Sequence, residues 1–173
     1  MVRMPLEFYF DSFVGVPNVL HQATIELDND QIKALPTTVV EVVAAPGANK
    51  VIILLAATAK LNKAAVTAYA AATDSSWVFT LNTFQTALFP CESLLETTGL
   101  ITYAVLFTPT APAIGGGDFD GYVTGTATAE ENTALTFGDL EMGVADYTGG
   151  NAANTLLVTV QYTILNTLTG LFE

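Results

Sequence analysis

The residues that could do acid, base or metal chemistry gather in one acidic part of the chain. Asp118 and Asp120 follow three consecutive glycines. Two carboxylates two residues apart on a Gly-rich loop can turn toward one hard cation such as Ca²⁺, which takes about six to eight oxygen ligands. The remaining oxygens would have to come from the acids that follow, which are Glu130, Glu131, Asp139 and Glu141. The spacing does not match an EF-hand loop, and a solvated acidic loop accounts for these residues more simply.

The same acids could be arranged as a glycosidase pair, but the sequence offers no other part of an active site. Such a pair needs a set separation across a cleft, and nothing in the sequence places Trp77, the only tryptophan, near it. His21 is the only histidine, and no Gly-x-Ser-x-Gly elbow surrounds any serine. We therefore predict that His21 has a structural role, and that the protein is not an enzyme and needs no cofactor.

The charge of the chain excludes another class of function. The net charge is −12, and all five cations lie in residues 1–63 beside six acids, which gives 5 − 6 = −1 there. Residues 64–173 hold eleven acids and no Lys or Arg, which gives −11. Nucleic-acid binding needs a basic surface, so we predict no nucleic-acid partner.

The composition favours a protein that hides part of its surface in an assembly. Only 13% of the residues are charged, against roughly 25% in an average protein. The longest apolar run, residues 51–59, is too short to cross a bilayer, and Glu7 and Asp11 interrupt the N-terminal apolar residues, so we expect neither a membrane partner nor a classical secretion signal. The single cysteine, Cys91, excludes a disulfide framework and is expected to be a small buried residue.

The elements that must position these residues are strands. The clearest is residues 156–165, where apolar and mostly polar residues alternate with the two-residue period of a half-buried strand after a Gly-Gly-Asn turn. Alternation also predicts a strand at residues 21–27, and a Pro-Gly turn predicts a hairpin between residues 38–43 and 51–55. Asp30 is expected to cap a helical turn at residues 31–35. Shorter strands are expected at residues 77–81, 101–107, 122–129 and 134–142, with a long connection at 84–96 that contains one helical turn, and a tail at 166–173.

About eight or nine short strands without alternating helices predict an all-β fold. We expect an antiparallel β-sandwich, jelly-roll-like, that forms a single domain over residues 21–173 and follows an extended N-terminal arm of residues 1–20. The arm carries four aromatic residues that would be costly to leave in water, so it packs on its own sheet or docks on a neighbouring subunit. The other face of the long strand carries leucines at both ends and could be covered by a partner. The predicted partner-binding residues are Phe8, Tyr9, Phe10, Phe13, Leu157 and Leu165.

Two stretches resemble a family of small virion proteins of tailed bacteriophages. One runs from Thr24-Ile25-Glu26-Leu27 through Asp30-Gln31-Ile32-Lys33-Ala34-Leu35-Pro36-Thr37-Thr38 to Val42-Val43-Ala44-Ala45-Pro46-Gly47-Ala48-Asn49-Lys50, and the other from Gly149-Gly150-Asn151 and Asn154-Thr155-Leu156 to Leu165. Together they cover about a third of the chain. Members of the family often have a proline where this chain has Val39 and a glycine where it has Asn49.

The resemblance implies a capsid cement, or decoration, protein. Such a protein would sit as a homotrimer on the capsid surface of the virion, bind the major capsid protein and be made in the host cytoplasm. The alternative is a receptor- or carbohydrate-binding head domain of a phage fibre or tail. Its candidate site would be the loops around Trp77 and residues 118–120.

Overall fold

The computed structural model describes residues 19–71, 75–82, 84–97, 102–107, 131–139 and 145–173. Within them, strands dominate and the two helices are short. The helices are α1 (Asn29–Ala34) and α2 (Glu92–Glu96). The strands are β1 (His21–Leu27), β2 (Val40–Val43), β3 (Lys50–Asn62), β4 (Tyr69–Ala70), β5 (Ser76–Leu81), β6 (Phe84–Pro90), β7 (Thr102–Phe107), β8 (Leu135–Asp139), β9 (Thr148–Gly149), β10 (Thr155–Asn166) and β11 (Leu171–Phe172). No helix of this described part is long and apolar enough to cross a membrane.

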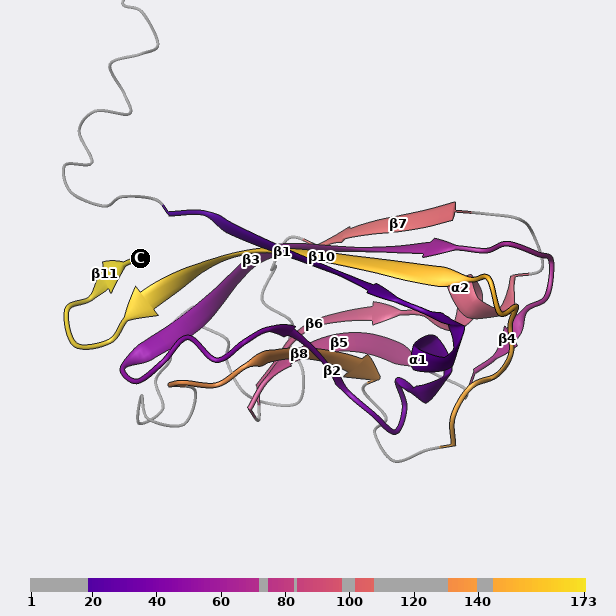
Figure 1. Cartoon of the computed structure of the whole chain (residues 1–173), viewed down its shortest axis with the longest axis horizontal. Helices are drawn as coiled ribbons and strands as arrows, with labels where there is room; N and C mark the ends of the chain where they lie inside the picture. The colour runs from indigo at the N-terminus through magenta and orange to yellow at the C-terminus, as the bar shows by residue number, and fades with distance from the viewer. Residues whose placement is uncertain (1–18, 72–74, 83, 98–101, 108–130, 140–144) are drawn as a thin grey trace, which may run out of the picture.

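Two sheets contain most of the strands, and they lie one above the other in Figure 1. The first has the order β1-β10-β3-β7, with β11 also paired to β10, and the second has the order β2-β8-β5-β6. A small third sheet pairs β4 with β9. All pairs are antiparallel, which confirms the predicted all-β antiparallel class.

Four of the strand pairs are nested within one another. β5 pairs with β6, β3 with β7, β2 with β8, and β1 with β10, so each pair named here encloses the previous one within its span of the sequence. Two further pairs, β3 with β10 and β5 with β8, join these nested pairs into the two sheets. The chain is therefore arranged as one long antiparallel ribbon, with β5 and β6 at its tip, that is folded over on itself.

The side chains of β10 explain why it lies at the centre of its sheet. Leu156, Val158 and Val160 alternate along the strand and are fully buried. They belong to the same core cluster as Phe79 of β5 and Phe137 of β8, which come from the second sheet. Each such aliphatic side chain contributes roughly 1.5–3 kcal/mol when it leaves water. The predicted strand at residues 156–165 is confirmed, with one residue more at each end.

A bulge interrupts the long pairing between β10 and β3. Gln161 pairs with Ala56, whereas the next residue, Tyr162, pairs with Leu54, so Leu55 is the extra residue. A bulge sharpens the local twist of a sheet. Beyond it the consecutive residues Val51 and Ile52 are both buried, so β3 is covered on both faces at that end.

The predicted hairpin between residues 38–43 and 51–55 is wrong. β2 pairs with β8, while β3 pairs with β10 and β7, so the connection crosses from one sheet to the other. Its turn residues were read correctly, since Gly47 and Asn49 both have positive φ. A turn signal marks a change of direction, but the pairing partner depends on which apolar faces meet in the core.

Three shorter assignments also need correction. Asp28 rather than Asp30 caps α1: its carboxylate accepts from the backbone N–H groups of Asp30 (3.0 Å) and Gln31 (2.9 Å), and Gln31 Oε1 accepts from Asp28 N. This reciprocal capping box favours the earlier start. Part of the predicted connection at residues 84–96 is strand β6, followed by α2. The predicted tail at residues 166–173 turns back, and β11 pairs with β10.

The Gly-Gly turn before β10 is fixed by a buried polar network around one tyrosine. Tyr69 Oη donates to Asn29 Oδ1 at 3.0 Å and accepts from Asn154 Nδ2 at 3.0 Å. Asn154 Oδ1 in turn accepts from Ala64 N at 2.9 Å. All three polar side chains are buried, so these hydrogen bonds replace those lost to water. Gly150 packs directly against the Tyr69 ring, because a Cβ there would lie 2.3 Å from Tyr69 Cε1.

We therefore expect Gly150→Ala to destabilise the fold far more than Gly170→Ala. The two glycines have nearly equal φ, +70° and +68°, but a Cβ at Gly170 would meet nothing within 4 Å. In both variants the left-handed backbone conformation of the new alanine should lower the free energy of unfolding by about 1–2 kcal/mol. In Gly150→Ala the close contact with Tyr69 and Asn29 should lower it by about 1–3 kcal/mol more. Urea unfolding measures both losses. Equal losses for the two variants would contradict the close contact with Tyr69.

Candidate interaction surfaces

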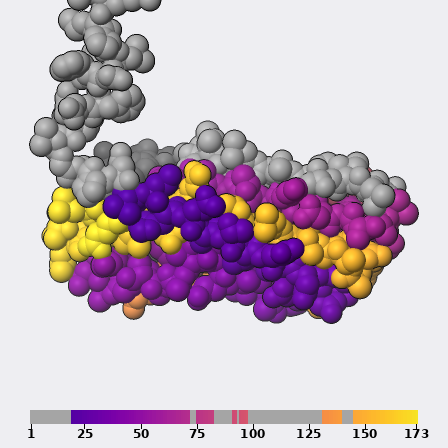
Figure 2. Space-filling view, turned by 45° about the horizontal axis from the view of Figure 1, so that its top comes forward, coloured from indigo at the N-terminus to yellow at the C-terminus, as the bar shows by residue number. Residues whose placement is uncertain are grey.

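One accessible surface is the side of the first sheet that points away from the core. We call it the outer face, and its members come from β1, β3 and β10. They are Gln22, Thr24, Glu26, Ala56, Thr58, Lys60, Leu157, Thr159 and Gln161. Figure 2 shows indigo β1, golden β10 and magenta β3 at the surface on this side. The neighbours of these residues along each strand include Leu61, Leu156 and Val158, which are buried, so the alternation of the strands fixes which side chains point outward.

Leu157 lies at the middle of a cross-strand row on this face. Glu26 of β1 pairs with Leu157 on one side, and Lys60 of β3 pairs with it on the other. Glu26 and Lys60 are exposed, whereas Leu157 is half-buried. The outer face as defined has one acid and one cation, so its net charge is zero in a chain of net charge −12.

The next rows of the outer face are uncharged. Thr24, Thr159 and Thr58 lie side by side in register, and Thr24 Oγ1 and Thr159 Oγ1 are 3.0 Å apart and hydrogen-bonded. Gln22, Gln161 and Ala56 form the row after that. Threonine suits a strand whose face is partly exposed, because its branched side chain packs on the pleat and its hydroxyl stays hydrated. The structure thus places Leu157 on an accessible, weakly charged surface, as the proposed contact role requires.

A second accessible surface lies at one end of the molecule. β10 extends beyond its pairing with β1, and its last residues, Leu165 and Asn166, pair instead with Phe172 and Leu171 of β11. β11 therefore pairs with the part of β10 that β1 would reach if β1 began earlier in the chain. Four exposed apolar side chains surround this place, and we call them the arm end: Val19, Leu20, Leu168 and Leu171. The half-buried Leu165 lies in the strand beneath them.

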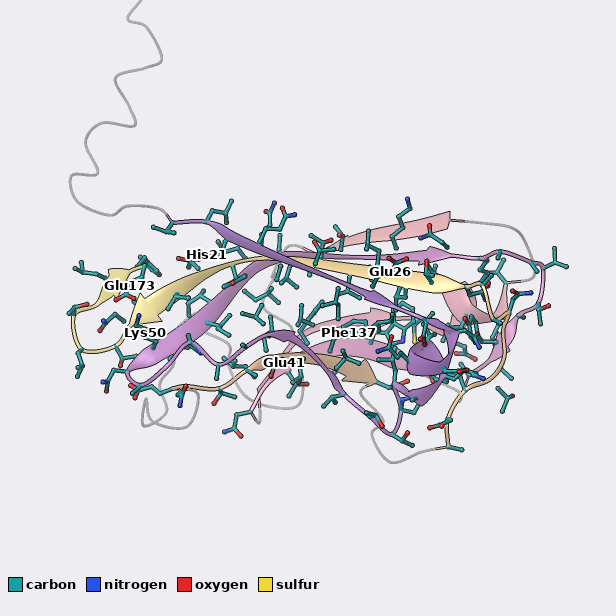
Figure 3. All side chains as sticks on the ribbon, in the orientation of Figure 1. His21, Glu26, Glu41, Lys50, Phe137 and Glu173 are labelled. Atoms are coloured by element: carbon teal, nitrogen blue, oxygen red, sulfur yellow. The ribbon has the colours of Figure 1, made fainter. Side chains whose placement is uncertain are left out.

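Contacts of one residue, Glu173, hold the arm end to the sheet. Its backbone oxygen accepts from His21 Nε2 at 2.9 Å, and its backbone N–H donates to Ile164 O at 2.8 Å. Its carboxylate forms an ion pair with Lys50 and accepts from Asn166 Nδ2. The hydrogen bond from Lys50 is the main cause that lowers the pKa of Glu173. Figure 3 shows His21, Lys50 and Glu173 together at this end.

The predicted structural role of His21 agrees with its surroundings. Its ring stacks on Tyr162 of β10, with centroids 5.2 Å apart, and the hydrogen bond to Glu173 lies at the start of β1. The remaining predicted contact residues of the arm, Phe8, Tyr9, Phe10 and Phe13, lie outside the described residues.

Asp139, a member of both the candidate carboxylate pair and the candidate calcium site, lies in the core. Asp139 is fully buried, and Tyr147 Oη donates to its carboxylate. The Cys91 sulfur lies 3.8 Å from the same Tyr147 hydroxyl. Because the single proton of Tyr147 points to Asp139, the Cys91 thiol is the donor to Tyr147 Oη. The expected burial of Cys91 is confirmed.

Among the candidate acids that the structure describes, Glu131 and Asp139 are not brought together. Glu131 accepts from Thr167 Oγ1 near the arm end, before β8, whereas Asp139 ends β8 and pairs with Trp77. Trp77 is 0% exposed and packs edge-on against Phe137, so its own ring cannot stack on a sugar. Residues 118–120, Glu130 and Glu141 lie outside the described residues. Within the described part, no three His, Cys, Asp or Glu side chains form a group that could hold a metal ion.

Comparisons with known proteins do not assign the chain to a family. No family model matches it, and a search of curated proteins finds no match.

Sequence reasoning identified Leu157 but missed the two charges beside it. Glu26 and Lys60 are far apart in the sequence, and only the register of three strands places them in one row. The alternation in residues 21–27 did assign Glu26 to the polar side of its strand, but no local pattern gives its cross-strand neighbours.

We expect Tyr147→Phe to lower the free energy of unfolding by about 1–3 kcal/mol. The change removes the hydroxyl that donates to the buried Asp139 carboxylate and leaves this group underpaired. Tyr162→Phe is the control, because Tyr162 is half-exposed and its ring stack on His21 is retained. Urea unfolding at pH 7 compares the two variants. A loss below about 0.5 kcal/mol for Tyr147→Phe would show that the hydrogen bond is dispensable.

We expect the Cys91 thiol to resist modification in the folded protein. Burial is the main cause that raises its pKa to about 12, so at pH 8 a disulfide reagent should react roughly a thousandfold more slowly than with protein unfolded in guanidinium. The folded thiol also holds its proton more tightly than the unfolded one. Its contribution to stability is therefore complete below pH about 8.5 and is lost as the pH rises toward about 12. The Cys91→Ala variant should lack this loss of stability at high pH. Equal rates of reaction of Cys91 in the folded and the unfolded protein would contradict its burial.

Proposed function

We propose that the protein is a capsid cement, or decoration, protein of a tailed bacteriophage. In this proposal it is a homotrimer on the outer surface of the virion, where it binds the major capsid protein and clamps adjacent subunits. It has no catalytic role and binds no nucleic acid. The resemblance of residues 24–50 and 149–165 to small virion proteins supports this reading, as do the low charge content and the absence of a metal-binding cluster in the described part of the chain.

The strand order supports a jelly-roll β-sandwich as the scaffold. If β1, β2, β3, β5, β6, β7, β8 and β10 are numbered one to eight, the sheets have the orders 1-8-3-6 and 2-7-4-5. Eight antiparallel strands in nested pairs, folded into two sheets with a shared core, are the arrangement of a jelly roll, which is found in viral capsid and lectin domains. Residues 21–173 would form this domain, preceded by the arm of residues 1–20.

The observation that carries the proposal is the arm end. β11 occupies the edge of β10 where the arm would otherwise continue β1, and four of the seven exposed large apolar side chains of the described residues lie at this point. Exposed apolar patches on a protein surface mark interaction sites. The arm with its four aromatic residues is joined to this patch, so arm and arm end together offer one apolar contact region to the capsid.

The proposed stabilisation works through mass action. A ligand that binds the assembled shell, and not its free subunits, lowers the free energy of the shell as its own concentration rises above the dissociation constant. A contact of roughly 800 Å² on each partner is the usual size for a specific interface. An apolar arm that spans two capsid subunits adds such area without any change in the shell itself.

We expect removal of residues 1–13 to abolish binding to purified capsids. The deletion removes the aromatic residues of the arm and leaves the described sheets intact. Occupancy is measured by sedimentation of capsids with bound protein, and unfolding temperature confirms that the domain still folds. Unchanged occupancy would reject the arm as the capsid contact.

We expect Leu168→Asp to lower capsid occupancy by roughly tenfold, because it places a charge within the arm end. Leu168 is 76% exposed, so the change should not affect folding. Val66→Asp is the matched control, because Val66 is 62% exposed but lies beyond the opposite end of β3. Equal effects of the two variants would mean that added negative charge, rather than the arm end, controls binding.

A further inference from the structure

We infer that the outer face is a binding surface for a second copy of this chain. The two copies pack face to face. The two-fold axis that relates them lies between the two faces, runs nearly parallel to β10 and passes over Leu157. The contact uses side chains of β1, β3 and β10 that are not part of the arm end, so it goes beyond the proposed capsid binding.

The order of side chains in the Leu157 row makes the face complementary to itself. Across β1, β10 and β3 the row reads Glu26, Leu157, Lys60, and Ala104 of β7 follows Lys60 in register. Rotation by 180° about an axis along β10 reverses this order in the second copy. Glu26 of each copy then faces Lys60 of the other, and the two Leu157 side chains meet at the axis. A charge-depleted apolar centre with charged residues at its rim is the usual composition of a protein interface.

Within one copy these two charges do not form an ion pair with each other. They lie on β1 and β3, with β10 between them, so their backbones are two strand spacings or roughly 9.5 Å apart. The other described lysines have partners within the chain: Lys33 with Asp30, Lys50 with Glu173, and Lys63 with the Leu95 and Thr97 carbonyls. Among the described residues, no ion pair joins Glu26 or Lys60 to another side chain. A second copy supplies the missing partner for both.

The charge of the whole chain favours this face over others for self-association. Two copies of net charge −12 repel each other, so they can approach only where the local charge is close to zero. The outer face has a net charge of zero, and its two other rows are threonine, glutamine and alanine. Stacked sheets pack about 10 Å apart, which allows such short side chains to interdigitate.

The size of the face predicts a weak contact. Three strands of about seven residues cover roughly 14 Å by 23 Å, about 320 Å² on each copy, which is well below the roughly 800 Å² of a standard interface. One such contact should associate only at high micromolar concentration or above. Three contacts between two stacked trimers would act together, so avidity would strengthen the pairing if the proposed trimer forms.

The mass of the free protein separates this inference from the proposed function. When the two-fold axis crosses the three-fold axis at a right angle, as in two stacked trimers, the two contacts close into a six-copy particle. Sedimentation equilibrium up to about 0.5 mM should therefore show two copies if the face pairs without a trimer, and six if both contacts form. A mass that stays at one or three copies over this range would overturn the inference, and three copies would leave the proposed trimer intact.

A charge exchange tests the arrangement of the face itself. Glu26→Lys alone places two lysines opposite each other in every pair, and Lys60→Glu alone places two glutamates opposite each other. Each variant should weaken the pairing at least tenfold. An equimolar mixture of the two variants should restore it to within about threefold of the native chain, because in a mixed pair each introduced charge faces its opposite.

Glu41→Lys is the matched control, because it makes the same charge change at an exposed position on β2, in the other sheet (Figure 3). It should leave the pairing unweakened. A mixture that associates no better than its components would overturn the face-to-face arrangement, as would an equal loss for Glu41→Lys and Glu26→Lys. Thermal unfolding of each variant checks that folding is retained, which is expected because all three substituted side chains are exposed.

Discussion

The fold depends on the pairing of β10 between β1 and β3. This 12-residue strand bonds to β3 along its whole length and to all seven residues of β1, and its buried residues complete the core that the second sheet provides from below. Without β10, β1 would have no partner in its sheet, and the nested strand pairs would be joined only through β5 and β8. Because β10 comes last among the long strands, the sheet closes only after almost the whole chain is available. Such long-range pairing is costly in loop entropy before it is rewarded by contacts.

The polar groups buried beside this core show how its connections are fixed. The Tyr69 network holds the turn that leads into β10, and the network of Asp139, Tyr147 and Cys91 holds the end of β8. Burial raises the pKa of both Tyr147 and Cys91, so these groups keep their protons and donate hydrogen bonds instead of reacting. A carboxylate, a tyrosine and a cysteine in contact resemble a catalytic group by their types alone. Their complete burial makes them a structural feature.

The sequence was a good guide wherever the signal was local. The alternation of residues 21–27 and 156–165 gave two strands almost to the residue, and the glycines at 149 and 150 marked a turn that has positive φ in the structure. It failed where the outcome depends on partners far along the chain. A Pro-Gly turn cannot say whether β2 and β3 pair or belong to different sheets. Likewise, Leu157 could be recognised as an apolar residue on a polar side, but its charged neighbours follow from register alone. The exception among the local signals is the cap of α1, where Asp28 and Gln31 form a capping box three residues apart that the sequence reading missed.

Register also explains why a surface with so few charges can still be specific. On the outer face, specificity cannot come from many polar contacts, because threonine, glutamine and alanine form most of it. It can come from the asymmetric placement of one acid and one cation about an apolar centre, since only one orientation of a second copy brings opposite charges together. A slip of one residue along the partner would place the row opposite the space between two outward-pointing rows and weaken both charge contacts at once. The same two-residue alternation that buries Val158 therefore also fixes the pattern that a second copy would meet.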